Sequence, residues 1–167
     1  MIKQPRLALA VIHLVLDTGE RLPCLVDAHT WLPLRLPMRW AVRYRRYRLQ
    51  SSTLAGNLRV LAKIYTWAWQ VANMDLDDYL TSDHRLTARQ IESLAAYLRE
   101  RKGADGSTVI TPNSYNQQLA VAENFLTWAL YPANRGGASA LTFEQLSAER
   151  DRLKFLFQSL HMRTGQS

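Results

Sequence analysis

The chain contains 167 residues, carries a net charge of +7 and is 47% hydrophobic, which is typical of one folded domain and excludes a disordered protein. It has no run of about 18 apolar residues, so a membrane-spanning helix is not expected. The single cysteine, Cys24, excludes an internal disulfide and a cysteine-ligated metal cluster. We therefore expect a protein of a reducing cytoplasm.

The basic residues are concentrated in one part of the sequence. Between Ala28 and Met74 there are eight lysines or arginines and no acidic residue. A segregated basic zone is typical of a protein whose partner is a polyanion. Nucleic acid is the first candidate partner and an anionic membrane the second, and the simpler interpretation is an ordinary basic surface.

The first expected element is a β-hairpin at residues 7–26. Leucine and branched residues fill its two halves, and Gly19 can take a positive φ in the turn between them. Residues 27–38 contain Pro33 and Pro37 and predict an extended connector, because proline disfavours helix at the residue before it.

Apolar residues at helical spacing predict helices over most of the remaining chain. Residues 38–48 favour a short helix with an aromatic face beside a basic one. A long helix is expected over 53–72, capped by a hydroxyl residue within 51–53. Threonines with capping patterns, Thr87, Thr111 and Thr142, mark the starts of the later helices. These later helices are expected at 88–102, 112–130 and 143–162.

No constellation of catalytic residues is convincing. The four histidines are scattered without metal-ligand spacing, and no glycine-rich phosphate loop occurs, so neither a metal nor a cofactor is expected. Cys24 is interpreted as a small buried hydrophobic residue rather than a nucleophile. The five tryptophans could stack on nucleic-acid bases, but their helical spacing favours packing in the core.

Two predicted helix faces carry side chains suited to DNA. Cationic groups contact phosphates, whereas amides and hydroxyls contact phosphates or base edges. The helix at 53–72 presents Arg59, Lys63, Thr66 and Gln70. The helix at 112–130 presents the uncharged residues Asn113, Asn116, Gln117 and Asn124. The alternative interpretation is that both faces are simply solvated.

The order and spacing of these motifs resemble the N-terminal core-binding domain of tyrosine recombinases, the phage integrase family. The resemblance covers nearly the whole chain. It is carried by residues 45–54 with Ile64-Tyr65-Thr66-Trp67-Ala68, by Leu86-Thr87 at a helix start, and by residues 111–119 with Phe125-Leu126-Thr127-Trp128-Ala129. The hairpin and its proline-containing connector also resemble the N-terminal part of some large integrases of mobile elements.

The resemblance implies a mainly α fold, an orthogonal four- to five-helix bundle (the SAM-like core-binding domain) with an N-terminal β-hairpin and an extended connector. Residues 1–37 would form the hairpin and arm, 38–162 the DNA-binding bundle, and 163–167 the start of a linker to a catalytic domain. Two helices of such a bundle lie toward the DNA major groove, and the last, 143–162, contacts other recombinase protomers. The positions carried over as DNA-binding are Arg39, Arg43, Arg45, Arg46, Arg48, Thr53, Asn57, Arg59, Lys63, Asn113, Asn116, Gln117 and Asn124.

The family's strand-cleaving residues do not occur in this chain. That chemistry uses two arginines, a lysine, a His/Trp pair of positions and a tyrosine nucleophile. Here His161-Met162-Arg163 has the wrong spacing for His-x-x-Arg, and no tyrosine follows Tyr131. The resemblance therefore implies sequence-tolerant to site-specific binding of double-stranded DNA without cleavage, by the N-terminal clamp half of a recombinase or by a catalysis-free relative.

Two other functions remain open at this point. A helical protein–protein adaptor could use the basic window to bind an acidic partner. A weaker alternative is binding of RNA or single-stranded DNA through the tryptophans.

Overall fold

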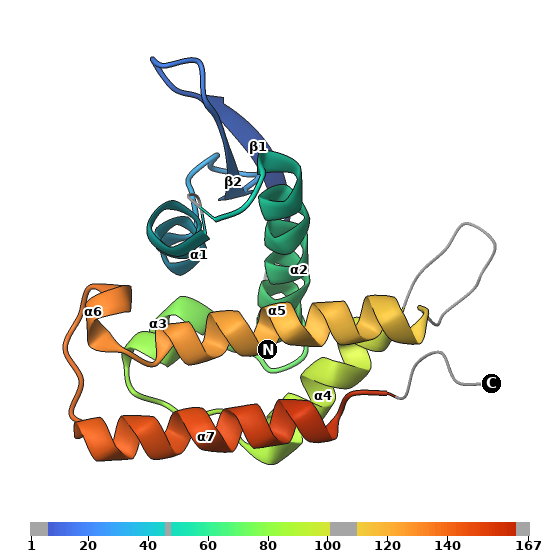
Figure 1. Cartoon of the computed structure of the whole chain (residues 1–167), viewed down its shortest axis with the longest axis vertical. Coiled ribbons are helices and arrows are strands. Elements are labelled where there is room, and N and C mark those ends of the chain that lie inside the picture. The colour runs from blue at the N-terminus through green and yellow to red at the C-terminus, as the bar shows by residue number, and fades with distance from the viewer. Residues whose placement is uncertain (1–6, 46–47, 101–109, 163–167) are drawn as a thin grey trace, which may run out of the picture.

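The structure is a computed structural model that describes residues 7–45, 48–100 and 110–162 (Figure 1). It is mainly helical, with an antiparallel two-stranded hairpin at its N-terminal end, which confirms the predicted fold class. Within those ranges no helix combines the length and the hydrophobicity that a membrane span requires.

The hairpin consists of β1 (Leu9–Val15) and β2 (Arg21–Asp27), paired so that Ile12 lies opposite Cys24. Gly19 takes φ +86° in the connecting turn, a conformation that its missing Cβ permits. β2 is buried over all but its ends, whereas the last residues of β1 are exposed. The buried strand packs against a long helix described below, so the hairpin is supported by the bundle.

The extended connector predicted for residues 27–38 is wrong in its second half, because helix α1 (Arg35–Trp40) already begins at Arg35. Pro37 lies in the first turn of α1. Backbone N–H groups in a first turn have no acceptor within the helix, so the proline ring removes no hydrogen bond there. α1 continues directly into a π-helical turn, η1 (Ala41–Arg45).

Helix α2 (Ser51–Gln70) confirms the long helix predicted for 53–72. Its N-cap is Gln50, which makes no side-chain capping hydrogen bond, so the predicted hydroxyl cap at 51–53 is wrong. A short helix, α3 (Leu76–Thr81), follows where the sequence suggests only a turn.

The three later helices begin where the sequence places them. Each of the threonine caps, Thr87, Thr111 and Thr142, accepts a hydrogen bond from the backbone N–H three residues further on. These three long helices are α4 (Ala88–Arg99), α5 (Pro112–Ala129) and α7 (Phe143–Ser159). A short helix, α6 (Pro132–Arg135), lies between α5 and α7 and ends at Gly136, which has the left-handed conformation.

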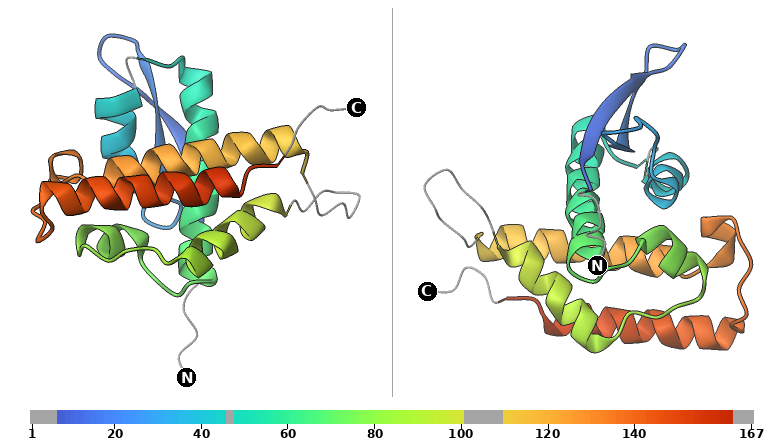
Figure 2. Two further views of the ribbon diagram at one scale, coloured as in Figure 1. Left: turned by 60° about the horizontal axis from the view of Figure 1, so that its bottom comes forward. Right: turned by 180° about the vertical axis from the view of Figure 1, so that it is seen from behind.

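One hydrophobic core joins these elements. α5 crosses α2 and runs beside α7, while α4 lies obliquely to both (Figures 1 and 2). Trp40 of α1 packs edge-on against Phe125 of α5 with ring centroids 5.9 Å apart, and Tyr65 of α2 contacts the same ring. Leu22 and Leu25 of the hairpin belong to the same buried cluster. These contacts fix the position of α2 relative to α5, and these two helices carry the polar faces described next.

Candidate nucleic-acid interface

The polar face of α2 forms as its periodicity predicts. Arg59, Lys63 and Gln70 are exposed along one side of the helix, and Thr66 between them is half-buried. The Thr66 hydroxyl donates to the carbonyl of Ala62 at 2.7 Å, one turn earlier in the same helix. The two cationic side chains are therefore the part of this face that is presented outward.

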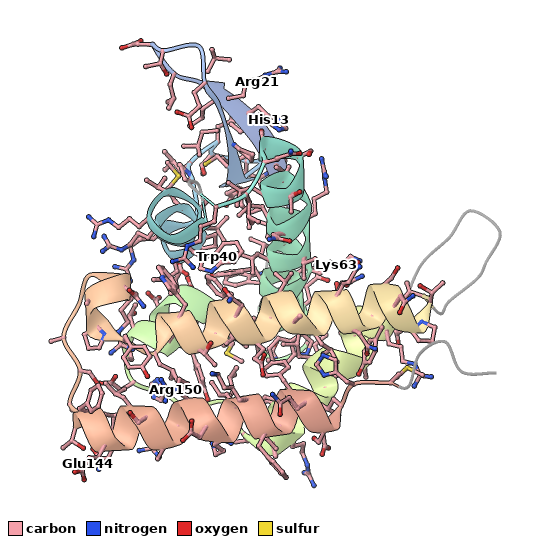
Figure 3. All side chains as sticks on the ribbon, viewed as in Figure 1. His13, Arg21, Trp40, Lys63, Glu144 and Arg150 are labelled. Atoms are coloured by element: carbon pink, nitrogen blue, oxygen red, sulfur yellow. The ribbon has the colours of Figure 1, made fainter. Side chains whose placement is uncertain are left out.

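A hydrogen bond joins this face to α5. The Lys63 Nζ donates to the Oε1 of Gln118 at 3.3 Å, and Figure 3 shows Lys63 beside α5 where the two helices cross. Asn113 and Gln117 are exposed on the N-terminal half of α5, close in sequence to this contact. The structure therefore joins Lys63 of α2 to α5 through Gln118, while Asn113 and Gln117 lie on a neighbouring, exposed side of α5.

Two of the predicted amides on α5 have partners inside the molecule. The Asn116 Nδ2 donates to the carbonyl of Met162 at 2.8 Å, and its Oδ1 accepts from the backbone N–H of Met162 at 2.9 Å. The Oδ1 of Asn124 accepts from the indole N–H of Trp40 at 3.3 Å. Asn116 thus fixes the chain that follows α7, and Asn124 fixes α1.

Thr53 and Asn57 are separated from the cationic face of α2. Thr53 is exposed and Asn57 is half-buried. At about 100° per residue, Thr53 lies roughly 80–120° and Asn57 roughly 120–160° around the helix from Arg59 and Lys63. They do not share one face with the two cations, so they are placed at the edge of the candidate surface.

The arginines of the basic window occupy different environments. The Arg39 Nε donates to the carbonyl of Asn134 at 2.9 Å, and its guanidinium lies against Gly136, so this side chain is half-buried on the α6 loop. Arg43 is exposed, and Arg48 is exposed with a partner within the molecule. Two further arginines predicted to bind DNA lie outside the described residues: the side chain of Arg45 and the whole of Arg46.

Two arginines outside the basic window form ion pairs with carboxylates. Arg135 pairs with Asp83 at 2.6 Å and Arg152 with Glu149 at 2.5 Å. Burial tends to raise the pKa of Asp83, but hydrogen bonds from Arg135, the Ala140 N–H and the Ser139 hydroxyl outweigh it and hold the pKa below its usual value. The hydrogen bonds that Arg152 donates to Glu149, opposed by burial, raise the pKa of Arg152. These pairs are structural and lie apart from Arg59 and Lys63 in the sequence.

The structure also places the tryptophans, the cysteine and the potential metal ligands that the sequence raised as candidates. Trp40, Trp67 and Trp128 are buried, which confirms core packing for these tryptophans, but Trp31 is 62% exposed. Burial raises the pKa of the Cys24 thiol, as expected for a hydrophobic setting. Nowhere in the described part of the chain do three histidine, cysteine or acidic side chains converge as a metal site requires.

Gln118 belongs to the candidate surface although its sequence position does not predict this. It lies off the exposed polar face of α5, turned toward α2.

Comparison with known protein families, curated proteins and solved structures finds no match to this chain.

Proposed function

We propose that this chain binds double-stranded DNA as the N-terminal clamp half of a tyrosine-type site-specific recombinase acting in DNA integration or recombination. The observation that carries the proposal is the Lys63–Gln118 hydrogen bond, which holds the cationic face of α2 next to the N-terminal half of α5, where Gln117 is exposed one residue away. A surface of this kind combines phosphate ligands with groups able to contact base edges.

Each side chain has a distinct role in this proposal. Arg43, Arg59 and Lys63 are exposed cations and contact phosphates, which positions the duplex but carries no sequence information. Asn113 and Gln117 are exposed amides, and an amide can pair with both the N6 and N7 of adenine in the major groove. Asn116 has a structural role, since both of its side-chain polar atoms bond to Met162, and the Oδ1 of Asn124 is bonded to Trp40.

The last long helix provides the contact to neighbouring protomers in this proposal. Phe143 and Phe155 of α7 are 75% and 70% exposed, although large aromatic side chains normally dominate cores and interfaces. The proposal assigns no strand cleavage to this chain, because the His-x-x-Arg motif and a tyrosine after Tyr131 are missing from its sequence.

The decisive experiment is a salt titration of duplex binding. The logarithm of the affinity should fall linearly with the logarithm of salt concentration, by about 0.9 for each phosphate contacted. Lys63→Ala should weaken binding to every duplex similarly and reduce the slope by about 1. Lys154→Ala removes the same charge from the exposed side of α7 and serves as the matched control, which should leave the slope unchanged.

Three results would count against the proposal. A flat salt dependence would exclude phosphate contacts as the source of affinity. Equal losses for Lys63→Ala and Lys154→Ala would show that only net charge matters. Binding to a charge-matched acidic protein but not to duplex would favour the adaptor function instead.

Sequence readout is tested separately on α5. If Gln117 contacts a base edge, Gln117→Ala should relax the preference at one base pair, at a cost of about 1–3 kcal/mol for the preferred base. Binding to a library of duplexes, sequenced before and after selection, measures this preference. A uniform loss across the library would instead assign Gln117 to phosphate contact.

A further inference from the structure

An exposed apolar knob lies between the hairpin and α1. It consists of Trp31 and Leu32, which are 62% and 66% exposed. The turn that carries it is held by backbone hydrogen bonds, from the Trp31 N–H to the carbonyl of Asp27 at 2.7 Å and from the Asp27 N–H to the carbonyl of Leu32 at 3.0 Å. The knob is therefore presented in one defined position.

The backbone conformation of Trp31 is unfavourable for its side chain. Its φ is +61°, in the left-handed region that glycine adopts readily and a bulky residue rarely does. Backbone strain persists where surrounding contacts hold it, here the two hydrogen bonds of the turn, and it tends to occur at binding and switch sites. Because the side chain of Trp31 is mostly in solvent, it is available for contact with a second molecule.

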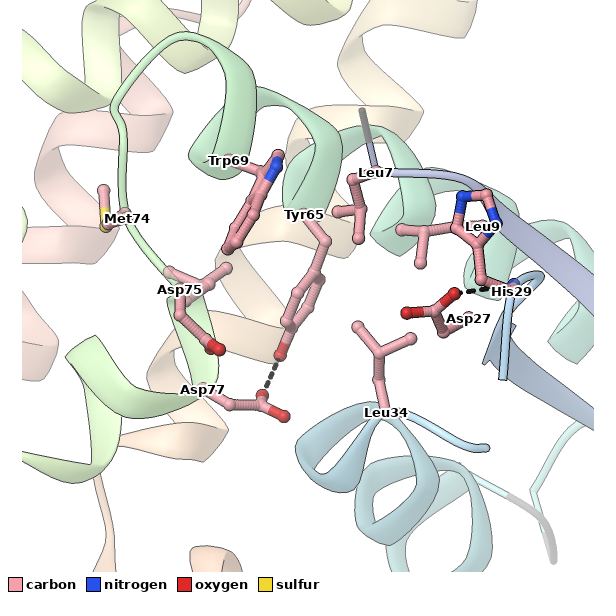
Figure 4. A pocket seen from close by; sticks show the side chains of 11 residues that line it. Leu7, Leu9, Asp27, His29, Leu34, Tyr65, Trp69, Met74, Asp75 and Asp77 are labelled. Carbon is pink, nitrogen blue, oxygen red and sulfur yellow. Dashed lines mark hydrogen bonds between the residues drawn. The ribbon is translucent and has the colours of Figure 1, made fainter. Parts of the chain in front are cut away.

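A pocket of about 380 Å³ lies between the hairpin, α2 and the segment before α3, and Figure 4 shows the side chains that line it. His29 and Leu34, which flank the knob in the sequence, both line it. Its walls are largely apolar, with carboxylates around them. The apolar lining residues are Leu7, Leu9, Leu34, Trp69, Met74 and Leu76, and the acidic ones are Asp27, Asp75 and Asp77.

The chemistry of the pocket matches the side chain that forms the knob. Tryptophan combines a large apolar surface with a single N–H donor, which finds an acceptor when it is buried. Ionised carboxylates are acceptors only, so Asp27 or Asp75 at the pocket wall could receive that N–H. The apolar walls would cover the rest of the indole ring.

We propose that Trp31 of one copy of this chain inserts into this pocket of a second copy, and that the second copy reciprocates. Because knob and pocket lie side by side on one molecule, each copy can offer both to the other, which gives a closed twofold dimer rather than a filament. DNA is disfavoured as the occupant, because Asp27, Asp75 and Asp77 would repel phosphates.

The pocket and the proposed DNA surface use different residues of α2. Tyr65 and Trp69 line the pocket, and their positions lie roughly a third of a turn around the helix from Arg59 and Lys63. The two surfaces adjoin, because Leu7 and Leu9 also line a neighbouring cavity with Lys63 and Thr66. Self-association without DNA and duplex binding are measured separately, so each proposal can fail without the other.

Sedimentation of the full chain without DNA tests the dimer. Wild type should self-associate with concentration. Truncation of a buried interface tryptophan commonly weakens binding by about 30-fold, and two such contacts per dimer predict a loss of about 1,000-fold for Trp31→Ala. Val15→Ala, which truncates a side chain of similar exposure at the hairpin turn, is the matched control and should dimerise like wild type.

A mixing experiment separates direct insertion from damage to the fold. Leu9→Trp fills the pocket but keeps the knob, whereas Trp31→Ala keeps the pocket. Each alone should be monomeric, and their mixture should form a mixed dimer about 30-fold weaker than wild type through the one remaining contact. Trp31→Gly should also be monomeric but should unfold at a higher denaturant concentration than the equally monomeric Trp31→Ala, since glycine adopts the left-handed backbone without strain.

Several outcomes would overturn the inference. One is a wild-type chain that stays monomeric up to about 1 mM, the range of the weakest specific complexes. Another is a mixture that does not associate. A third is loss of dimerisation in Phe155→Ala but not in Trp31→Ala, which would place the interface on α7. Loss of DNA affinity in Trp31→Ala without any change in self-association would assign the knob to nucleic acid.

Discussion

Arg135 shows how a single buried charge is accommodated. Only 2% of its side chain is exposed, and its guanidinium donates to Asp83, to the carbonyl of Leu80 at 2.8 Å and to the carbonyl of Ala138 at 3.0 Å. Removing one partner of such a pair leaves an uncompensated charge, which commonly costs about 3–5 kcal/mol. Because Asp83 also has a left-handed φ of +59°, asparagine is the replacement that keeps its backbone preference.

Asp83→Asn should therefore lower the free energy of unfolding by about 3 kcal/mol at pH 7. The folded-state pKa of Asp83 is lowered, so the pair contributes fully above about pH 4 and its contribution is lost as the pH falls through the folded-state pKa. Urea unfolding at pH 7 and pH 3 should show the difference from wild type shrinking in acid. Asp151→Asn, in the exposed pair with Arg150, is the control and should change little. A pH-independent difference would contradict this account.

Asn116 and Gln117 are neighbours with opposite expected phenotypes. Asn116→Ala removes both hydrogen bonds to Met162 and should lower the free energy of unfolding by about 1–3 kcal/mol, while DNA affinity of the folded protein and its salt slope stay unchanged. Gln117→Ala should leave stability unchanged. Thermal unfolding and duplex binding, measured on the same samples, check both. A stable Asn116→Ala with weakened binding would return Asn116 to the DNA surface.

At the scale of elements, α2 begins without the side-chain cap that the other long helices have. Gln50 has φ −66° and ψ 154°, which is the extended geometry of an N-cap, but its side chain accepts no helix N–H. Gln50→Ser should stabilise the protein by about 1 kcal/mol without altering the charge near the DNA surface. Thr142→Ala, which removes an existing capping box, should cost about the same amount. Denaturant midpoints of the two variants should move in opposite directions.

The sequence was a good guide to elements whose signals are local. The capping patterns at Thr87 and Thr142 and the proline after Thr111 predicted the starts of α4, α7 and α5. The start of α1 was mispredicted, because the rule that proline disfavours helix does not hold in a first turn. Contacts between distant residues were beyond local patterns, since the partner of Lys63 lies 55 positions away in the sequence.

Local sequence patterns predict only part of the candidate surface. Periodicity predicted which side of α2 carries Arg59 and Lys63, because burial of the opposite side is a property of one helix. It could not show that Asn116 and Asn124 are used internally, since their acceptors and donors come from the end of α7 and from α1. The exposure of Trp31 was likewise unpredictable, because it depends on a left-handed residue in an irregular turn.

At the scale of the whole molecule, the hairpin and the bundle share one hydrophobic core. An isolated hairpin is marginal in water, and β2 here buries Leu22 and Leu25 in the cluster formed with α1, α2 and α5. Leu25 also accepts a backbone hydrogen bond from Leu34 at 3.0 Å, which ties the strand to the start of α1. The chain should therefore unfold in a single cooperative transition.

Leu25→Ala distinguishes a shared core from two independent units. Truncation of a fully buried leucine costs about 2–5 kcal/mol, and in a shared core this loss should lower the unfolding midpoint of the helices themselves. The helical circular dichroism signal reports on the bundle alone, since the hairpin contributes no helix. If the hairpin were an independent appendage, Leu25→Ala would leave the helical transition at its wild-type midpoint. Val15→Ala, at the exposed end of β1, should leave it unchanged in either case.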